Sequence, residues 1–203
     1  MKIVLVGATG TIGAPVAALL RENGHDVVEA TRKSNPSLDI TDAASVEAFF
    51  KATGEVDAVV CVAGDAAFAP LEALTDDQVQ LCSDSKLMGQ VNLVRRALPY
   101  LRPGGSFVLT GGILAYTPWP ATSMIALVNS GVEGFVRGAS LDLKDGRRAA
   151  VVHPPFVAET ARALGMDATP WPPAAKAAEA YLQALTDSKN GAVYFVEGYA
   201  PQA

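Results

Sequence analysis

Short hydrophobic runs alternate along the chain with longer segments in which hydrophobic residues recur at helical spacing. The short runs predict strands at residues 2–6, 26–31, 56–61, 106–110, 149–153 and 192–197. The longer segments predict helices at residues 11–23, 43–53, 76–101, 123–144 and 174–186. This alternation is typical of a parallel sheet with helices on both faces. We therefore expect an α/β fold: one doubly wound parallel β-sheet in a three-layer α/β/α arrangement.

The composition fits a single globular domain over residues 1–203. Half of the 203 residues are hydrophobic and 18% are charged, which is enough for one sizeable core. The sequence has no internal repeat, and the proline-rich stretch 169–173 is too short to divide domains. The net charge of −5 argues against nucleic acid or an anionic membrane as a partner.

The two cysteines, Cys61 and Cys82, indicate a reducing compartment. They are too few for a disulfide framework and lack metal-ligand spacing, so we expect no metal site. The chain runs from Met1 directly into the first predicted strand, without the features of an export signal. A cytoplasmic location is therefore expected.

The strongest motif is a turn with glycines at Gly7, Gly10 and Gly13. It follows the hydrophobic residues 3–6 directly and opens a predicted helix. Glycines let the backbone turn sharply and approach a pyrophosphate, whose charge is then bound by free N–H groups at the helix N-terminus. This context favours a dinucleotide site on a Rossmann-type sheet over an ordinary glycine-rich turn.

The end of the second predicted strand indicates which dinucleotide binds. An acidic residue there would bind a ribose 2′-hydroxyl and repel a 2′-phosphate. The chain instead has Thr31, Arg32, Lys33 and Ser34, which offer two positive charges and two hydroxyl groups. This favours NADP(H), although a solvated basic loop is the alternative. Glu29 lies inside the strand and is expected to be a packing or surface residue.

The Gly-x-x-Gly-x-x-Gly spacing resembles the short-chain dehydrogenases and reductases, and further segments in the correct order extend the resemblance over almost the whole chain. Residues 39–42 (Asp-Ile-Thr-Asp) resemble the family's adenine-contacting loop, and residues 61–64 (Cys-Val-Ala-Gly) its Asn-Asn-Ala-Gly strand end. Residues 105–110, 132–135 and 153–157 match the later strand, the central helix and the Pro-Gly turn.

Together, the motifs and the resemblance imply a cofactor site for NADP(H). Its expected residues are Gly7, Thr9, Gly10, Thr11, Ile12, Gly13, Thr31, Arg32, Lys33, Ser34, Asp39, Ile40, Ala63, Gly64, Lys86 and Pro154.

The resemblance fails at the family's catalytic residues. It places Ile125 where the family has its catalytic tyrosine, Asn129 where it has its lysine, and Gly112 where it has its serine, so Thr110 is the nearby hydroxyl. Lys86 stands where the family has an asparagine, so lysine and asparagine are exchanged. The candidate catalytic residues are therefore Lys86, Asn129 and Thr110.

Each candidate also has a structural alternative. Lys86 could be a solvated surface residue, and Asn129 could satisfy a backbone carbonyl in a buried helix. The other candidate proton donors, Tyr116, Ser123 and His153, lie away from the family's catalytic position.

Two functions from different classes remain open. The first is an NADPH-dependent oxidoreductase with a non-standard active site, reducing a carbonyl or an activated C=C. The second is an NADP(H)-binding sensor or scaffold, or a non-redox enzyme on the same fold.

The short segment 159–173 predicts an open pocket for a small apolar or aromatic substrate, lined by Phe156, Leu164, Met166, Trp171, Tyr116 and Trp119. The long hydrophobic helices predict a homodimer.

Overall fold

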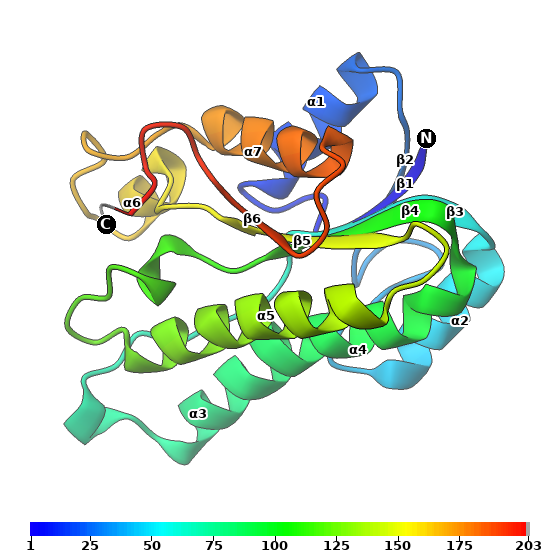
Figure 1. The fold of residues 1–203 in the computed structure, drawn as a ribbon. Helices are drawn as coiled ribbons and strands as arrows, with labels where there is room; N and C mark the ends of the chain where they lie inside the picture. Colours follow the sequence, from blue (N-terminus) through cyan, green and yellow to red (C-terminus); the bar gives the residue numbers. More distant parts are fainter. Residues whose placement is uncertain (202–203) are drawn as a thin grey trace.

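The computed structural model describes residues 1–201 and contains one six-stranded parallel sheet with the strand order β2-β1-β3-β4-β5-β6 (Figure 1). The strands are β1 (Lys2–Val6), β2 (Asp26–Ala30), β3 (Val56–Cys61), β4 (Leu101–Thr110), β5 (Arg148–His153) and β6 (Ala192–Phe195). The helices are α1 (Gly13–Glu22), α2 (Ala43–Thr53), α3 (Asp76–Cys82), α4 (Gly89–Ala97), α5 (Ser123–Asp142), α6 (Ala158–Ala163) and α7 (Ala174–Thr186).

The helices form a layer on each face of the sheet. Helices α1 and α7 cover one face, and α2, α4 and α5 cover the other (Figure 1). Successive side chains of a strand point to opposite faces, so Ile3 and Leu5 pack toward α1 and α7, while Val4 and Val6 pack toward the other layer. The expected doubly wound three-layer fold is confirmed.

The expected helix at 76–101 is wrong in its extent. The chain forms α3, then a π-helical segment (Ser83–Met88), then α4, and it leaves the α-helix after Ala97. Pro99 lacks a backbone N–H and cannot continue the helix, so a short 3₁₀ turn (Leu98–Tyr100) follows. Strand β4 then begins at Leu101, five residues earlier than expected.

The other differences are small. Residues 11 and 12 belong to the glycine turn, so α1 begins at Gly13. Helix α6 lies in a segment for which the sequence predicted no helix, because its six residues are too few for a recognisable helical pattern. Within residues 1–201, none of the helices has both the length and the hydrophobicity that a membrane span requires.

The carboxyl ends of β1, β3, β4 and β5 lie at the same edge of the sheet, because parallel strands share one direction. The segments that follow these strands carry the glycine turn, Gly64, Gly111 and Pro154. Ligands of open α/β sheets bind at this edge. The fold thus brings the expected cofactor and catalytic segments to one side of the molecule.

Candidate functional site

The glycine turn is closely packed. Gly7 has φ +83°, and a Cβ there would lie 3.0 Å from the backbone nitrogen of Ala63. A Cβ on Gly13 would lie only 2.0 Å from the carbonyl oxygen of Gly7, so a side chain cannot be accommodated there. In the part of the chain that the structure describes, the N–H groups of Thr11 and Ile12 have no protein acceptor, and no side chain caps α1. Open N–H groups at a helix N-terminus fit an anionic phosphate group.

The basic segment follows β2, as expected. Arg32 and Lys33 are exposed. The Thr31 hydroxyl accepts a hydrogen bond from the Lys33 N–H at 3.1 Å. The Ser34 hydroxyl accepts from the Thr31 N–H at 2.9 Å and lies 2.8 Å from the Thr31 carbonyl oxygen. The two hydroxyls therefore shape the turn. Glu29 is paired with Arg21 at 2.6 Å, in agreement with a surface role.

The expected adenine-contacting segment has one ordered carboxylate. Asp39 accepts hydrogen bonds from the N–H and the hydroxyl of Thr41, at 2.9 and 2.8 Å, and the backbone hydrogen bond is the main reason that its pKa is lowered. The side chain of Ile40 is buried instead. A Cβ on Gly89 would lie 2.9 Å from its Cδ1, so Ile40 packs against the beginning of α4.

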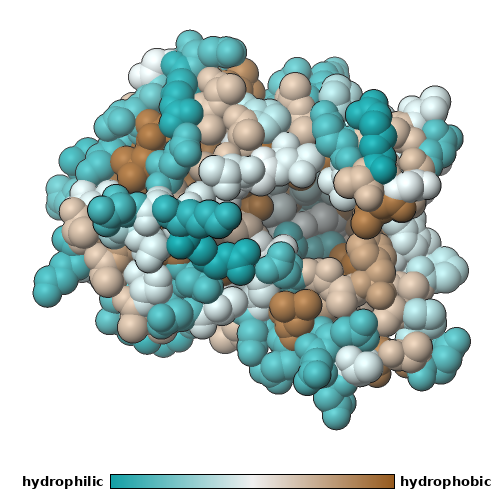
Figure 2. Space-filling view, turned by 180° about the vertical axis from the view of Figure 1, so that it is seen from behind, coloured by the Kyte–Doolittle hydropathy of each residue, from teal (hydrophilic) through white to brown (hydrophobic). Residues whose placement is uncertain are grey.

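A cavity of about 300 Å³ lies at the carboxyl ends of the strands, lined by residues from several segments. Its lining includes Lys86, Asn129, Thr110, Gly64, Ile12, Ile125 and Pro154. The space-filling view of Figure 2 shows a hollow on the face opposite that of Figure 1, with hydrophobic and hydrophilic side chains around it. The structure therefore brings all three candidate catalytic residues to one cavity.

Lys86 lies in the π-helical segment and presents its side chain to this cavity. Burial lowers the pKa of its amine to about 8, partly opposed by the nearby Cys61 and Asp65. Among the described residues, no hydrogen-bond acceptor is found for its Nζ. The Lys86 side chain is half-buried at the wall of the cavity, which favours the site role over that of a surface residue. A partly desolvated amine without an acceptor is typical of a group that interacts with a ligand.

Thr110 lines the cavity, but its hydroxyl is engaged inside the protein. It donates to the Cys61 carbonyl at 2.5 Å and lies 2.8 Å from the Tyr181 hydroxyl. The residue thereby connects the ends of β3 and β4 with α7. This geometry favours a structural role over proton donation.

Asn129 occupies the space beside the turn that follows β4. It is 3% exposed, and its Oδ1 has no hydrogen-bond partner among the described residues. A Cβ on Gly112 would lie 2.6 Å from its Nδ2, and a Cβ on Gly111 would lie 2.5 Å from the His153 ring. A serine therefore cannot replace either glycine without moving Asn129 or His153. Buried Ile125, on the same helix, has no polar atom in its side chain.

Two of the other candidate proton donors, His153 and Tyr116, lie behind this turn and share contacts with Glu133. Fully buried His153 has its Nδ1 3.1 Å from the Gly112 nitrogen and 2.9 Å from the Gly112 oxygen, and its Nε2 lies 3.1 Å from Oε2 of Glu133. Burial lowers the pKa of His153. Tyr116 donates a hydrogen bond to Glu133. The sequence analysis named Tyr116 and His153 as candidate proton donors, but it could not predict their contacts with Glu133, because the three residues come from separate segments of the chain.

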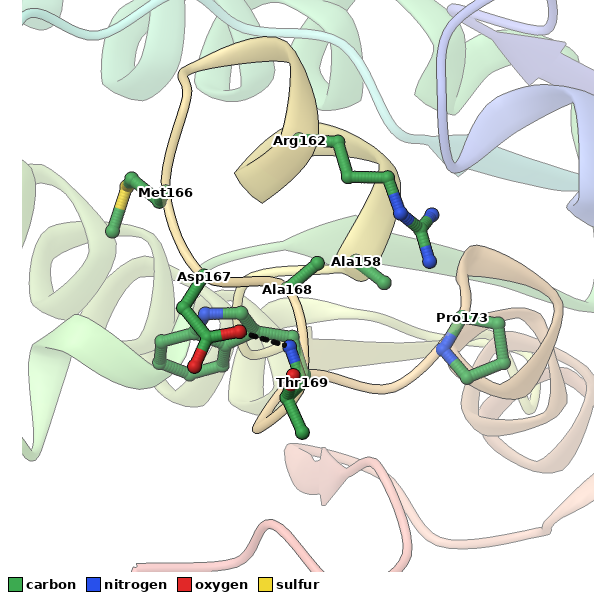
Figure 3. Close-up of a pocket in the computed structure, with 8 residues that line it drawn as sticks. Ala158, Arg162, Met166, Asp167, Ala168, Thr169 and Pro173 are labelled. Carbon is green, nitrogen blue, oxygen red and sulfur yellow. Dashed lines mark hydrogen bonds between the residues drawn. The ribbon is translucent and has the colours of Figure 1, made fainter.

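The expected apolar wall is divided between two cavities. Phe156 lines the site cavity, with Phe68, whereas Tyr116, Trp119 and Leu164 do not. Met166 and Trp171 line a second cavity of about 580 Å³, where Arg162 points away from Asp167 (Figure 3). None of the expected cofactor or catalytic residues lines this second cavity. Residues 1–201 also contain no cluster of three or more His, Cys, Asp or Glu side chains that could hold a metal ion.

Comparison with known proteins identifies the family. Residues 7–190 match the model of a short-chain dehydrogenase family described as enoyl-(acyl carrier protein) reductase. The chain belongs to the short-chain dehydrogenases and reductases. The resemblance of the glycine turn and the later segments is thereby confirmed, and this is a family of oxidoreductases.

Individual members of the family are moderately similar. A 3-ketodihydrosphingosine reductase of Bacteroides thetaiotaomicron is 25% identical over 155 residues, which is 70% of this chain but 58% of that protein. The structure of the protein lin1944 of Listeria innocua is 34% identical with a TM-score of 0.89, covering 97% of this chain and 99% of that one. A small-chain dehydrogenase in complex with NADPH is 27% identical with a TM-score of 0.87, covering 98% and 97%.

Proposed function

We propose that this short-chain dehydrogenase/reductase is NADPH-dependent and reduces a carbonyl or an activated C=C of a small apolar or aromatic substrate. The observation that carries the proposal is the amine of Lys86, which lines the cavity at the strand ends without an acceptor of its own. The NADPH bound to the similar small-chain dehydrogenase supports the choice of cofactor, as do the exposed charges of Arg32 and Lys33.

The residues present fit the cofactor. The N–H groups of the glycine turn would hold the pyrophosphate, and Arg32 and Lys33 would bind the 2′-phosphate. Gly64 and Pro154 line the cavity and would border the reactive end of the cofactor. When bound, NADPH supplies a hydride.

Lys86 takes the role for which the family uses a tyrosine. Its ammonium group donates a hydrogen bond to the substrate oxygen and polarises the C=O bond. As the carbon gains a hydride, the π electrons move to the oxygen, which takes a proton from the Lys86 Nζ. The neutral amine then regains a proton from solvent. Asn129 lines the same cavity and orients the substrate by donating a hydrogen bond from its Nδ2 to the substrate oxygen.

The cavity also supports the choice of substrate. Phe68, Phe156, Ile113 and Leu114 give it an apolar lining around the polar groups of Lys86 and Asn129. Such a lining favours a ligand that is hydrophobic except at its reacting carbonyl.

A second candidate function is cofactor binding without redox turnover. The replacement of the family's tyrosine by Ile125 favours it, as does the Thr110 hydroxyl, which is engaged with Cys61 and Tyr181. A sensor, a scaffold or a non-redox enzyme would need the glycine turn but not a proton donor.

A panel of aldehydes, ketones, quinones and enones tests the two candidates. Consumption of NADPH, followed by the absorbance of the reduced nicotinamide, is expected with at least one apolar carbonyl compound. The Gly10→Asp variant is the control, because its carboxylate would repel the pyrophosphate and abolish both binding and turnover. NADPH binding by the parent with no turnover on the whole panel would favour the sensor.

We also propose a cytoplasmic homodimer. Leu127 and Leu141 of α5 are 54% and 86% exposed, which leaves hydrophobic surface for a second copy. Light scattering on the purified protein measures the oligomeric state, and a monomer at micromolar concentration would contradict this proposal.

A further inference from the structure

Gln90 is fully buried near the beginning of α4, and its amide makes three hydrogen bonds. Nε2 donates to the Thr110 carbonyl and to the Lys86 carbonyl, each at 2.9 Å. Oε1 accepts from the Thr110 N–H, also at 2.9 Å. Every hydrogen-bonding group of the amide is therefore satisfied by main-chain atoms of two residues that line the site cavity.

The contact with Thr110 compensates for an opening in the sheet. Strands β3 and β4 pair only as far as Val60 opposite Val108, whereas β4 and β5 pair as far as Thr110 opposite Val152. The N–H and C=O of Thr110 thus extend beyond the last partner on the β3 side. The amide of Gln90 takes the place of a peptide group there, which avoids two unsatisfied buried backbone groups.

The hydrogen bond from Gln90 to the Lys86 carbonyl connects the end of β4 to the backbone of Lys86. Lys86 lies within the π-helical segment, a geometry that occurs mostly as single turns inside α-helices and frequently at functional sites. On its other side the Lys86 stem lies against Gly64, where a Cβ would be 2.8 Å from Cδ. The backbone of Lys86 is held by Gln90, and its side chain is directed by Gly64.

We propose that Gln90 is a positioning residue: its amide couples the end of β4 to the backbone of Lys86 and thereby sets where the Lys86 amine stands in the cavity. This inference rests on the proposed function of Lys86. Gln90 acts through Lys86, and its side chain is not part of the cavity lining.

The substitution Gln90→Met tests the coupling, because methionine has a similar length and no hydrogen-bonding amide. The other groups that act on the Lys86 amine, which are Asp65, Cys61 and His153, are unchanged in this variant. The protein is labelled with ¹³C at the Cε of its lysines and titrated with pH by NMR. The Lys86 signal is the one that is missing from the spectrum of Lys86→Met. In the parent the signal should titrate near pH 8.

In Gln90→Met we expect the amine to become more hydrated, so its pKa should rise by about half a unit or more toward the ordinary lysine value. Turnover should fall at least about tenfold in kcat, with the KM for NADPH within about threefold of the parent. The matched control is Tyr181→Phe, which removes a hydrogen bond to Thr110 from the same buried network; among the described residues, Tyr181 makes no hydrogen bond to Lys86. It should leave the Lys86 pKa unchanged.

A folded Gln90→Met protein with the parent's Lys86 pKa would overturn the proposal and make Gln90 purely structural. An equal pKa shift in Tyr181→Phe would overturn it too, since loosening of the whole network would then suffice. If Gln90→Met does not fold, Gln90→Asn, which is one methylene shorter, is used in the same way. The titration needs no substrate, so a parent without turnover contradicts the proposed function but leaves this test decisive.

Discussion

Gly64 and Lys86 lie in direct contact: a Cβ added to Gly64 would stand 2.8 Å from Cδ of Lys86 and 3.1 Å from its Cα. Gly64 also has φ +137°, in the region that favours glycine. The bare backbone of one residue therefore makes room for the stem of the other. Any side chain at residue 64 must displace the lysine.

The first prediction follows from this contact. Gly64→Ala should lower kcat by about tenfold or more, because Lys86 would move away from the substrate oxygen. Gly24→Ala is the control: Gly24 has φ +76°, and a Cβ there would have no other atom within 4 Å, so it tests backbone strain alone. Both variants should lose some stability in chemical denaturation. Equal kcat values in Gly64→Ala and the parent would show that the contact does not place Lys86.

The second prediction concerns the stability cost of Lys86. Its pKa is about 8 in the folded protein and near 10.5 when unfolded, so holding the ammonium form in the cavity at neutral pH is unfavourable. Lys86→Met should therefore raise the free energy of unfolding at pH 7 by roughly 2–3 kcal/mol, measured by urea denaturation.

The pH dependence provides the check on this second prediction. Between pH 8 and pH 10.5 the folded parent binds fewer protons than the unfolded chain, so its stability rises with pH. The advantage of Lys86→Met should shrink over the same range. Exposed Lys51 serves as the control, because Lys51→Met should show no such pH-dependent difference. A destabilised Lys86→Met protein at pH 7 would contradict the desolvation account.

The sequence predicted the sheet and the glycine turn because both depend on local patterns. The hydrophobic runs predicted each strand from β1 to β6, and the spacing of Gly7, Gly10 and Gly13 predicted the turn. The position of Lys86 at the cavity was also predicted, through its place in a segment that resembles the family.

Other features depend on contacts between distant residues, and no local pattern predicts them. The sequence identified Thr110 as a hydroxyl group near the site. Its hydrogen bonds, however, are made with Cys61 and Tyr181, which are 49 and 71 residues away in the chain. The π-helical turn around Lys86 interrupts a pattern that is helical throughout. The contacts of Gln90 with Thr110 and of His153 with Gly112 likewise depend on the folded arrangement, in which the ends of β4 and β5 lie side by side.

The third prediction tests the choice of cofactor. Arg32→Asp should weaken NADPH binding by about 10- to 150-fold, because it removes a charge-assisted hydrogen bond to the 2′-phosphate and adds repulsion. NADH binding should improve, since the new carboxylate accepts hydrogen bonds from the ribose hydroxyl. Calorimetric titration measures both affinities. The control Arg95→Asp makes the same change of charge at an exposed position of α4 and should alter neither. An unchanged NADPH affinity in Arg32→Asp would make Arg32 an ordinary surface residue.

The last prediction separates Lys86 from the position that the family fills with tyrosine. Lys86→Ala should lower kcat by about 100-fold or more, the effect of losing one acid or electrostatic contributor, while NADPH binding changes less. Ile125→Ala should affect packing only, since isoleucine cannot transfer a proton.

The pH profile of kcat adds a second readout. Lys86 has a pKa of about 8, so its ammonium form is lost above that pH. Reduction by the parent and by Ile125→Ala should therefore slow as the pH rises through 8. The residual rate of Lys86→Ala should not show this decline. If Lys86→Ala keeps the parent's kcat and pH profile on the same substrate, the proton comes from another group, and His153 and Tyr116 are the next to be replaced.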